Sequence, residues 1–176
     1  MTFAIGRRTA LSVAGLAAAA ATLTWIIPAQ AAPAAQATNI EQPAPKIAVD
    51  WAAAWNSSDT TLLAKLFTHN GIYTDYALDK TMTGSQEITA WKVGTDQRIA
   101  DIHVTILNAF QSDNHIAIEA TYAGHVNGAP TPFAVPITTI LELDHGKIAS
   151  DHDNYSLSSV LAQSGLPADT TSAPNT

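Results

Sequence analysis

The sequence contains no cysteine in its 176 residues. It therefore has no disulfide, no thiolate ligand for a metal and no thiol nucleophile, and it lacks the cysteine that anchors a bacterial lipoprotein. An exported form of this chain must rely on its packed core alone for stability.

Basic residues are also scarce. The chain has 8 Lys and Arg against 15 Asp and Glu, a formal net charge of −7. Two of the 8 are Arg7 and Arg8, and no acid precedes Glu41, so removal of the amino-terminal segment leaves six basic residues against all 15 acids. Neutralising a phosphate backbone takes clustered Lys and Arg, and no such cluster occurs here. We therefore expect no nucleic-acid partner.

The amino terminus has the three parts of a secretory signal peptide. Arg7-Arg8 precedes an apolar run from Leu11 to Ile27, which ends in Pro28-Ala29-Gln30-Ala31. We expect cleavage after Ala31 and export to the periplasm or outside the cell, with no membrane contact afterwards. The alternative is an uncleaved anchor, because the run approaches the roughly 20 apolar residues that span a bilayer. The adjacent arginines resemble a twin-arginine signal, so both the Sec and the twin-arginine routes remain open.

The remaining chain divides by composition. Residues 32–45 are rich in Ala, Pro, Gln and Thr without a period, which predicts a linker, and residues 167–176 have the composition of a disordered tail. Residues 46–166 are the length of one ordinary domain.

The first part of this domain has helical apolar spacing. A first helix presents Ile47, Trp51, Ala54 and Trp55 on one face. A second is capped by Asp59, carries the stripe Leu62, Leu63, Leu66 and Phe67, and ends at His69-Asn70-Gly71. A third starts at Gln86 behind a Ser85 cap and turns Ile88 and Trp91 inward.

The rest of the domain has the pattern of strands. A short β-rich segment covers residues 72–76, and longer strands are predicted over 102–110, 115–122, 133–143 and 147–155, with turn sequences between them. Helices followed by hairpin-linked strands indicate an α+β domain with a mostly antiparallel sheet. We expect a ligand pocket on the concave side of that sheet, against the helices.

The last predicted strand contains the largest group of side chains that could take part in acid/base chemistry. Side chains alternate along a strand, so Asp151, Asp153 and Tyr155 share one face, while His152 and Asn154 share the other. A short helix follows, with Leu157, Val160 and Leu161 at helical spacing. Two interpretations remain open: the acids line a pocket, or they form a solvated edge.

Six short motifs follow one another along the domain. They are W-x-x-A-W-N-S-x-D (51–59), L-x-x-L-F (63–67), G-I-Y-T-D (71–75), G-x-x-x-I (84–88), G-K-I (146–148) and D-x-Y-x-L-x-x-x-L-x-Q-x-G (153–165). Their order resembles that of the SnoaL-like polyketide cyclases of the nuclear-transport-factor-2-like superfamily. The resemblance implies a cone-shaped α+β barrel with a pocket inside. It also implies an acid/base aspartate in the last strands, where Asp153 and Asp151 stand.

Asp153 is the first candidate for an acid/base residue, supported by Asp151. In an apolar pocket desolvation raises a carboxyl pKa, which suits proton abstraction next to a carbonyl. Tyr73 shares a strand face with Asp75, and its phenol is a candidate donor to an oxyanion. The structural alternatives are an acid at the strand-to-helix junction for Asp153 and a half-buried tyrosine for Tyr73.

The candidate pocket-lining residues come from several segments. They are Trp55, Asp75, Trp91, His103, Glu119 and Tyr155. The six histidines show no metal-ligand spacing, and we expect no metal and no cofactor. Arg98 is the one arginine left after cleavage of the leader. Epoxide hydrolases of the superfamily use an Asp-Arg-Asp arrangement, but no spacing relates Arg98 to Asp153.

These observations predict an exported SnoaL-like domain that binds a small apolar or carbonyl-containing molecule, with acid/base chemistry of the isomerase, cyclase or hydrolase type. The alternative is a binding or assembly module without chemistry, so enzymatic activity is left open. We also expect a homodimer through the open face of the sheet.

Overall fold

The computed structural model describes residues 43–168. The predicted signal peptide (1–31), nearly all of the predicted linker (32–45) and most of the predicted tail (167–176) lie outside the described residues. None of the helices within residues 43–168 is long and apolar enough to cross a membrane.

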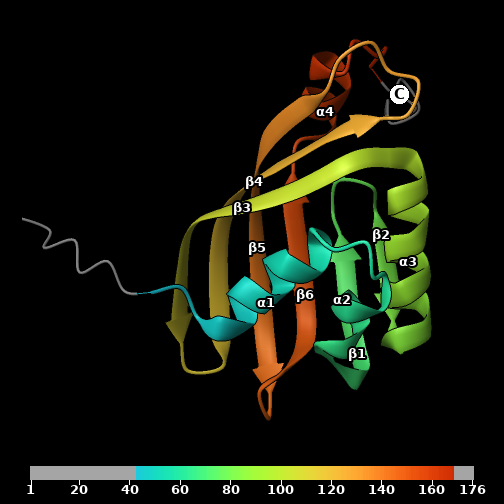
Figure 1. The fold of residues 1–176 in the computed structure, drawn as a ribbon. Helices are drawn as coiled ribbons and strands as arrows, with labels where there is room; N and C mark the ends of the chain where they lie inside the picture. Colours follow the sequence, from blue (N-terminus) through green and yellow to red (C-terminus); the bar gives the residue numbers. More distant parts are fainter. Residues whose placement is uncertain (1–42, 169–176) are drawn as a thin grey trace, which may run out of the picture. The chain divides into compact units, whose positions relative to one another are not determined.

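A curved sheet of six strands forms the body of the fold (Figure 1). Its strands stand in the order β2-β1-β6-β5-β4-β3, and every neighbouring pair is antiparallel except β1 with β6. Their bounds are β1 Phe67–Asp75, β2 Lys80–Thr83, β3 Ile99–Ser112, β4 His115–Val126, β5 Phe133–Asp144 and β6 Lys147–Tyr155. The predicted α+β class is confirmed, but β2 and β3 are free edges, so the sheet curves without closing into a barrel.

Four helices accompany the sheet: α1 Lys46–Trp55, α2 Thr61–Lys65, α3 Gly84–Arg98 and α4 Leu157–Gln163. α1 and α2 lie across one face of the sheet, α3 lies beside β1 and β2, and α4 packs against β5 (Figure 1). The helical spacing that predicted α1 largely marks its buried face, because Trp51, Ala54 and Trp55 are buried and Ile47 is half-buried against the core. These side chains join alternating residues of the strands in one core.

The predicted second helix is too long. α2 ends at Lys65, and both Phe67 and Gly71 belong to β1. Gly71 does not end a helix. A Cβ at this position would lie 2.9 Å from the Ile148 carbonyl oxygen and from Phe67, and the register with β6 shifts between Phe67 and Ile72. The glycine therefore allows a close approach of two strands at an irregularity in their pairing.

The start of α3 also differs from the prediction. The helix begins at Gly84, so Ser85 lies in its first turn and does not cap it. The Glu87 carboxylate instead accepts the backbone N–H of Thr83 at 2.7 Å, which gives a backbone donor at the start of the helix a partner. The preceding strand β2 was not predicted, because it is short, polar and at the edge of the sheet.

Candidate functional site

The parallel pairing of β1 with β6 assembles the acidic part of the site. In the register of these strands Tyr73 lies beside Asp151, and Asp75 lies beside Asp153. Because side chains alternate along a strand, all four point to the inner face of the sheet. All four are buried, with no more than 3% of any of them exposed.

Asp153 is held by a hydroxyl group at each carboxyl oxygen. The Tyr73 hydroxyl donates to Oδ2 at 2.5 Å. The Thr139 hydroxyl, from the facing position on β5, donates to Oδ1. Burial raises the pKa of Asp153 to about 6, while the hydrogen bonds from Thr139 and Tyr73 act in the opposite direction. Asp153 can therefore exchange a proton near neutral pH.

Asp151 lies directly behind Asp153 and is fully buried. The Trp51 indole N–H donates to its Oδ2 at 2.8 Å, and its other oxygen has no partner among the described residues. Burial, and then the charge of Asp153, raise the pKa of Asp151 well above its usual range. The interaction between the two side chains favours the protonated form of Asp151 and the ionised form of Asp153.

Asp75 is the third carboxyl group of the site. Its Oδ2 accepts the Tyr155 hydroxyl at 3.0 Å, and its Oδ1 accepts the backbone N–H of Leu78 at 2.9 Å. Burial raises the pKa of Asp75, and the hydrogen bond from Leu78 partly offsets this effect. Asp75 thus joins the turn that follows β1 to the wall of the pocket.

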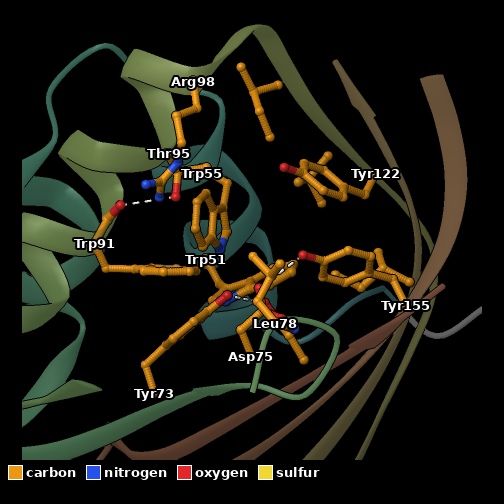
Figure 2. A pocket seen from close by; sticks show the side chains of 14 residues that line it. Trp51, Trp55, Tyr73, Asp75, Leu78, Trp91, Thr95, Arg98, Tyr122 and Tyr155 are labelled. Carbon is orange, nitrogen blue, oxygen red and sulfur yellow. Dashed lines mark hydrogen bonds between the residues drawn. The ribbon is translucent and has the colours of Figure 1, made fainter. Parts of the chain in front are cut away.

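A pocket opens in front of Asp75 and Asp153, with a cavity volume of about 60 Å³. A water molecule needs roughly 10–15 Å³ by this measure, so a few waters or one compact ligand fill it. Six aromatic residues surround the space: Trp51, Trp55, Tyr73, Trp91, Tyr122 and Tyr155 (Figure 2). The aromatic rings also contact one another, with centroids 6.0 Å apart for Trp55 and Tyr73 and 6.3 Å apart for Tyr73 and Trp91.

Most of the predicted site residues meet at this pocket. Asp153, Tyr73, Trp55, Asp75, Trp91 and Tyr155 line it, while Asp151 lies behind the wall. The predictions for His103 and Glu119 are wrong, because both side chains are exposed and neither lines the pocket. Glu119 lies between the buried Ile118 and Ala120, and alternation sends it to the outer face. The register of β3 shifts between Ala100 and His103, and His103 points outward as well.

Four residues of the site were not predicted: Trp51 as a hydrogen-bond donor, Thr139, Tyr122 and Arg98. Thr139 and Tyr122 occupy buried positions in the alternating pattern of β5 and β4. The two-residue alternation in the sequence could therefore have predicted that both side chains face inward. Nothing local marks Arg98, which reaches the pocket because α3 ends there.

Within residues 43–168, no group of three or more His, Asp or Glu side chains is arranged to hold a metal ion.

Helices packed on a curved open sheet, with acids and aromatic rings in an internal pocket, define a protein of the nuclear-transport-factor-2-like class. The model of the SnoaL-like domain family matches residues 48–151, and the chain belongs to this family. No curated protein matches the chain.

The solved structures agree with this assignment. A protein of ketosteroid isomerase-like fold from Catenulispora acidiphila, in complex with trimethylamine, is 52% identical, with a TM-score of 0.71 over 73% of this chain and 98% of that one. A structure described as a SnoaL-like polyketide cyclase from Shewanella denitrificans is 16% identical, with a TM-score of 0.58 over 67% of this chain and 93% of that one. An epoxide hydrolase of the LEH-like type from M. tuberculosis is 14% identical, with a TM-score of 0.57 over 67% and 86%. The last two share the fold alone.

Proposed function

We propose that the pocket binds a compact alkylated ammonium ion. The observation that carries this proposal is the combination of six aromatic rings with two buried carboxyl groups, Asp75 and Asp153, around one small cavity. The pocket has one basic lining residue, Arg98, which is exposed. Lys92 is buried nearby, but it pairs with Asp96 at 2.6 Å and does not line the cavity. A ligand cation therefore supplies the positive charge that the carboxyl groups lack.

Each part of such a ligand has a counterpart in the pocket. The methyl groups of an alkylated ammonium ion spread its charge over an apolar surface, which fits an aromatic wall better than water does. A cation over the face of Trp or Tyr gains about 0.5–1 kcal/mol at an exposed site and about 2 kcal/mol or more when desolvated. The carboxyl groups add direct charge attraction in a poorly solvated space, where it is much stronger than in water.

The Catenulispora acidiphila relative supports this ligand class. That protein was solved in complex with trimethylamine and is 52% identical over 73% of this chain. Trimethylamine is protonated at neutral pH, and its size suits a cavity volume of about 60 Å³. The proposal refines the expectation of a small apolar ligand by adding a positive charge.

A second candidate function is proton transfer within a bound carbonyl compound. The observation that favours it is the pKa of Asp153, raised to about 6 inside the pocket. Asp153 would remove a proton from the carbon next to the carbonyl, and the electron pair of the broken C–H bond would pass to the carbonyl oxygen as an enolate. The protonated Asp153 would then return the proton to carbon as the carbonyl forms again. Hydrolase chemistry of the Asp-Arg-Asp type is less favoured, because Arg98 forms no ion pair with any acid of residues 43–168.

Calorimetric titration distinguishes the two candidates. The cation proposal predicts that tetramethylammonium binds and that tert-butanol, a neutral molecule of similar shape, does not bind measurably. D153N removes a negative charge with little change in shape and should weaken tetramethylammonium binding by about tenfold or more. D79N, at an exposed turn position, is the matched control and should bind normally. Equal affinity for the two probes would refute the cation proposal.

The proton-transfer candidate has its own assay. Small ketones are incubated with the protein in deuterated water, and loss of the α-proton signal is followed by NMR. Exchange above the buffer rate that disappears in D153N would support this chemistry. Exchange that persists in D153N would rule out Asp153 as the base.

The predicted export remains a proposal. We propose cleavage after Ala31, and amino-terminal sequencing of the protein from the periplasm or medium should then begin at Ala32. A start at Met1 would rule out cleavage.

A further inference from the structure

We infer that Tyr122 and Arg98 form a second subsite, which binds an anionic group on the same ligand, so that the pocket selects a zwitterionic alkylammonium compound over a bare cation. This inference rests on the proposed function, and it names the substrate class of that site. The anionic group is a carboxylate, or a group of similar charge, a short distance from the ammonium nitrogen.

Tyr122 supplies a hydroxyl group that the protein leaves unused. Its side chain is only 8% exposed, and its ring packs edge-on against Phe133 and Tyr155, with centroids 5.1 and 5.5 Å away. Its hydroxyl points into the pocket (Figure 2) and forms no side-chain hydrogen bond within residues 43–168. The other two phenols of the pocket differ, because Tyr73 donates to Asp153 and Tyr155 donates to Asp75.

The protonation state of Tyr122 suits a donor. Burial, followed by the negative charges of Asp75 and Asp153, raises its pKa above the ordinary value for tyrosine. The hydroxyl therefore keeps its proton throughout the physiological range. The hydroxyl oxygen is not among the fully enclosed polar atoms of the described chain that lack a partner, so it is open to the pocket and can donate to an acceptor atom of a ligand.

Arg98, at the end of α3, supplies a positive charge to the lining of the same pocket. Its guanidinium carbon lies 5.8 Å from the centre of the Trp91 ring, which holds the group beside the pocket. It forms no ion pair with an acid of the described chain, so its donors are available to a carboxylate. The charge of Arg98 also lowers the pKa of Tyr122, opposite in direction to the effect of Asp75. The Tyr122 hydroxyl thus lies within the influence of both charges.

This arrangement of charge favours a zwitterion over a simple cation. Asp75 and Asp153 attract the ammonium group, but Arg98 repels it. A zwitterion places its ammonium group among the aromatic rings and carboxyl groups, and its anionic group near Arg98 and Tyr122. The small cavity accommodates the ammonium head, while the exposed position of Arg98 leaves space for the rest of the ligand.

The test compares glycine betaine with tetramethylammonium by calorimetry on the folded protein. Betaine carries the same methylated ammonium group plus one carboxylate, so the ratio of the two dissociation constants isolates the second subsite. We expect the wild type to bind betaine about tenfold more tightly, as one charge-assisted contact implies. R98M should weaken betaine and tighten tetramethylammonium, because it removes a partner from the first and a like charge from the second. Y122F, which deletes only the hydroxyl, should lower the betaine affinity toward that of tetramethylammonium.

K46M serves as the control, since it removes one positive charge from a side chain that is 86% exposed and does not line the pocket. It should leave the ratio unchanged. If tetramethylammonium binds but R98M and Y122F keep the wild-type ratio, or if betaine binds more weakly than tetramethylammonium to the wild type, the second subsite is refuted and the cation pocket stands. If neither probe binds, the proposed function itself fails.

Discussion

The Trp51 indole donates a 2.8 Å hydrogen bond to Asp151, 100 residues further along the chain. Both side chains are fully buried, so this contact joins the first helix to the last strand inside the core. It fixes Asp151 behind Asp153, and thereby sets the environment in which Asp153 titrates.

Trp51 should therefore contribute to stability through this hydrogen bond. W51F leaves a buried carboxyl oxygen without its donor and should lower the free energy of unfolding by about 1–3 kcal/mol from this effect. Urea denaturation at pH 7 measures the change. W55F is the matched control, because the Trp55 indole N–H has no partner to lose. An equal loss in the two variants would show that ring volume, and not the hydrogen bond, decides the stability.

The buried carboxyl groups predict a stability that falls as pH rises. The pKa values of Asp75, Asp151 and Asp153 are all raised, to about 6 for Asp153. Between pH 4 and 6 the folded protein therefore binds more protons than the unfolded chain, and each excess proton lowers stability by roughly 1 kcal/mol per pH unit. As the pH falls below the pKa of about 3.9 of an unfolded Asp, both states become protonated and this slope disappears.

Denaturation curves at half-unit steps from pH 4 to 8 measure this slope. D153N should flatten the decline between pH 4 and 6, while D79N at the exposed turn should keep the wild-type slope. Stability that rises with pH over this interval would contradict the assignment of raised pKa values.

The phenol of Tyr73 should help to set the pKa of Asp153. Its hydrogen bond lowers the pKa of Asp153, so Y73F should raise that pKa. If ionised Asp153 attracts the cation, the pH at which tetramethylammonium binding appears should move upward in Y73F. The measurement is a titration at pH 5, 6, 7 and 8. A pH profile identical to that of the wild type would mean that Asp153 does not govern binding.

The predicted homodimer can be tested on the outer face of the sheet. Phe110 is 62% exposed on β3, and Ile140 is 36% exposed on β5. Phe110 pairs with Ala117, which pairs with Ile140, so an apolar row crosses three strands. We expect a second copy to cover this row, and F110E should shift light scattering from dimer to monomer without changing tetramethylammonium affinity. A wild-type monomer at micromolar concentration would refute the dimer.

The sequence predicted the class of fold and the local faces of the strands. Alternation placed Asp151, Asp153 and Tyr155 on one side of β6, and the structure turns that side toward the pocket. It did not predict that β1 pairs in parallel with β6. That pairing joins segments about 80 residues apart, and no local pattern specifies it.

The misassigned residues follow from the same physical limits. Glu119 was correctly assigned to a strand. Its neighbours Ile118 and Ala120 are buried on the inner face, so the alternation of the strand puts the Glu119 side chain on the outer face. His103 follows a shift in register, which breaks a simple alternation. Arg98 lines the pocket because α3 ends beside it. The position of that helix end depends on tertiary packing, which no local sequence pattern specifies.

The most direct test of the cation pocket is the proton NMR signal of tetramethylammonium as it is titrated with the protein. Ring currents shift a group held among aromatic faces upfield, so the account predicts a saturable upfield shift of the methyl signal. D153N should reduce it, and excess glycine betaine should reverse it. A methyl signal that stays at its free position when the protein is in large excess would contradict the account.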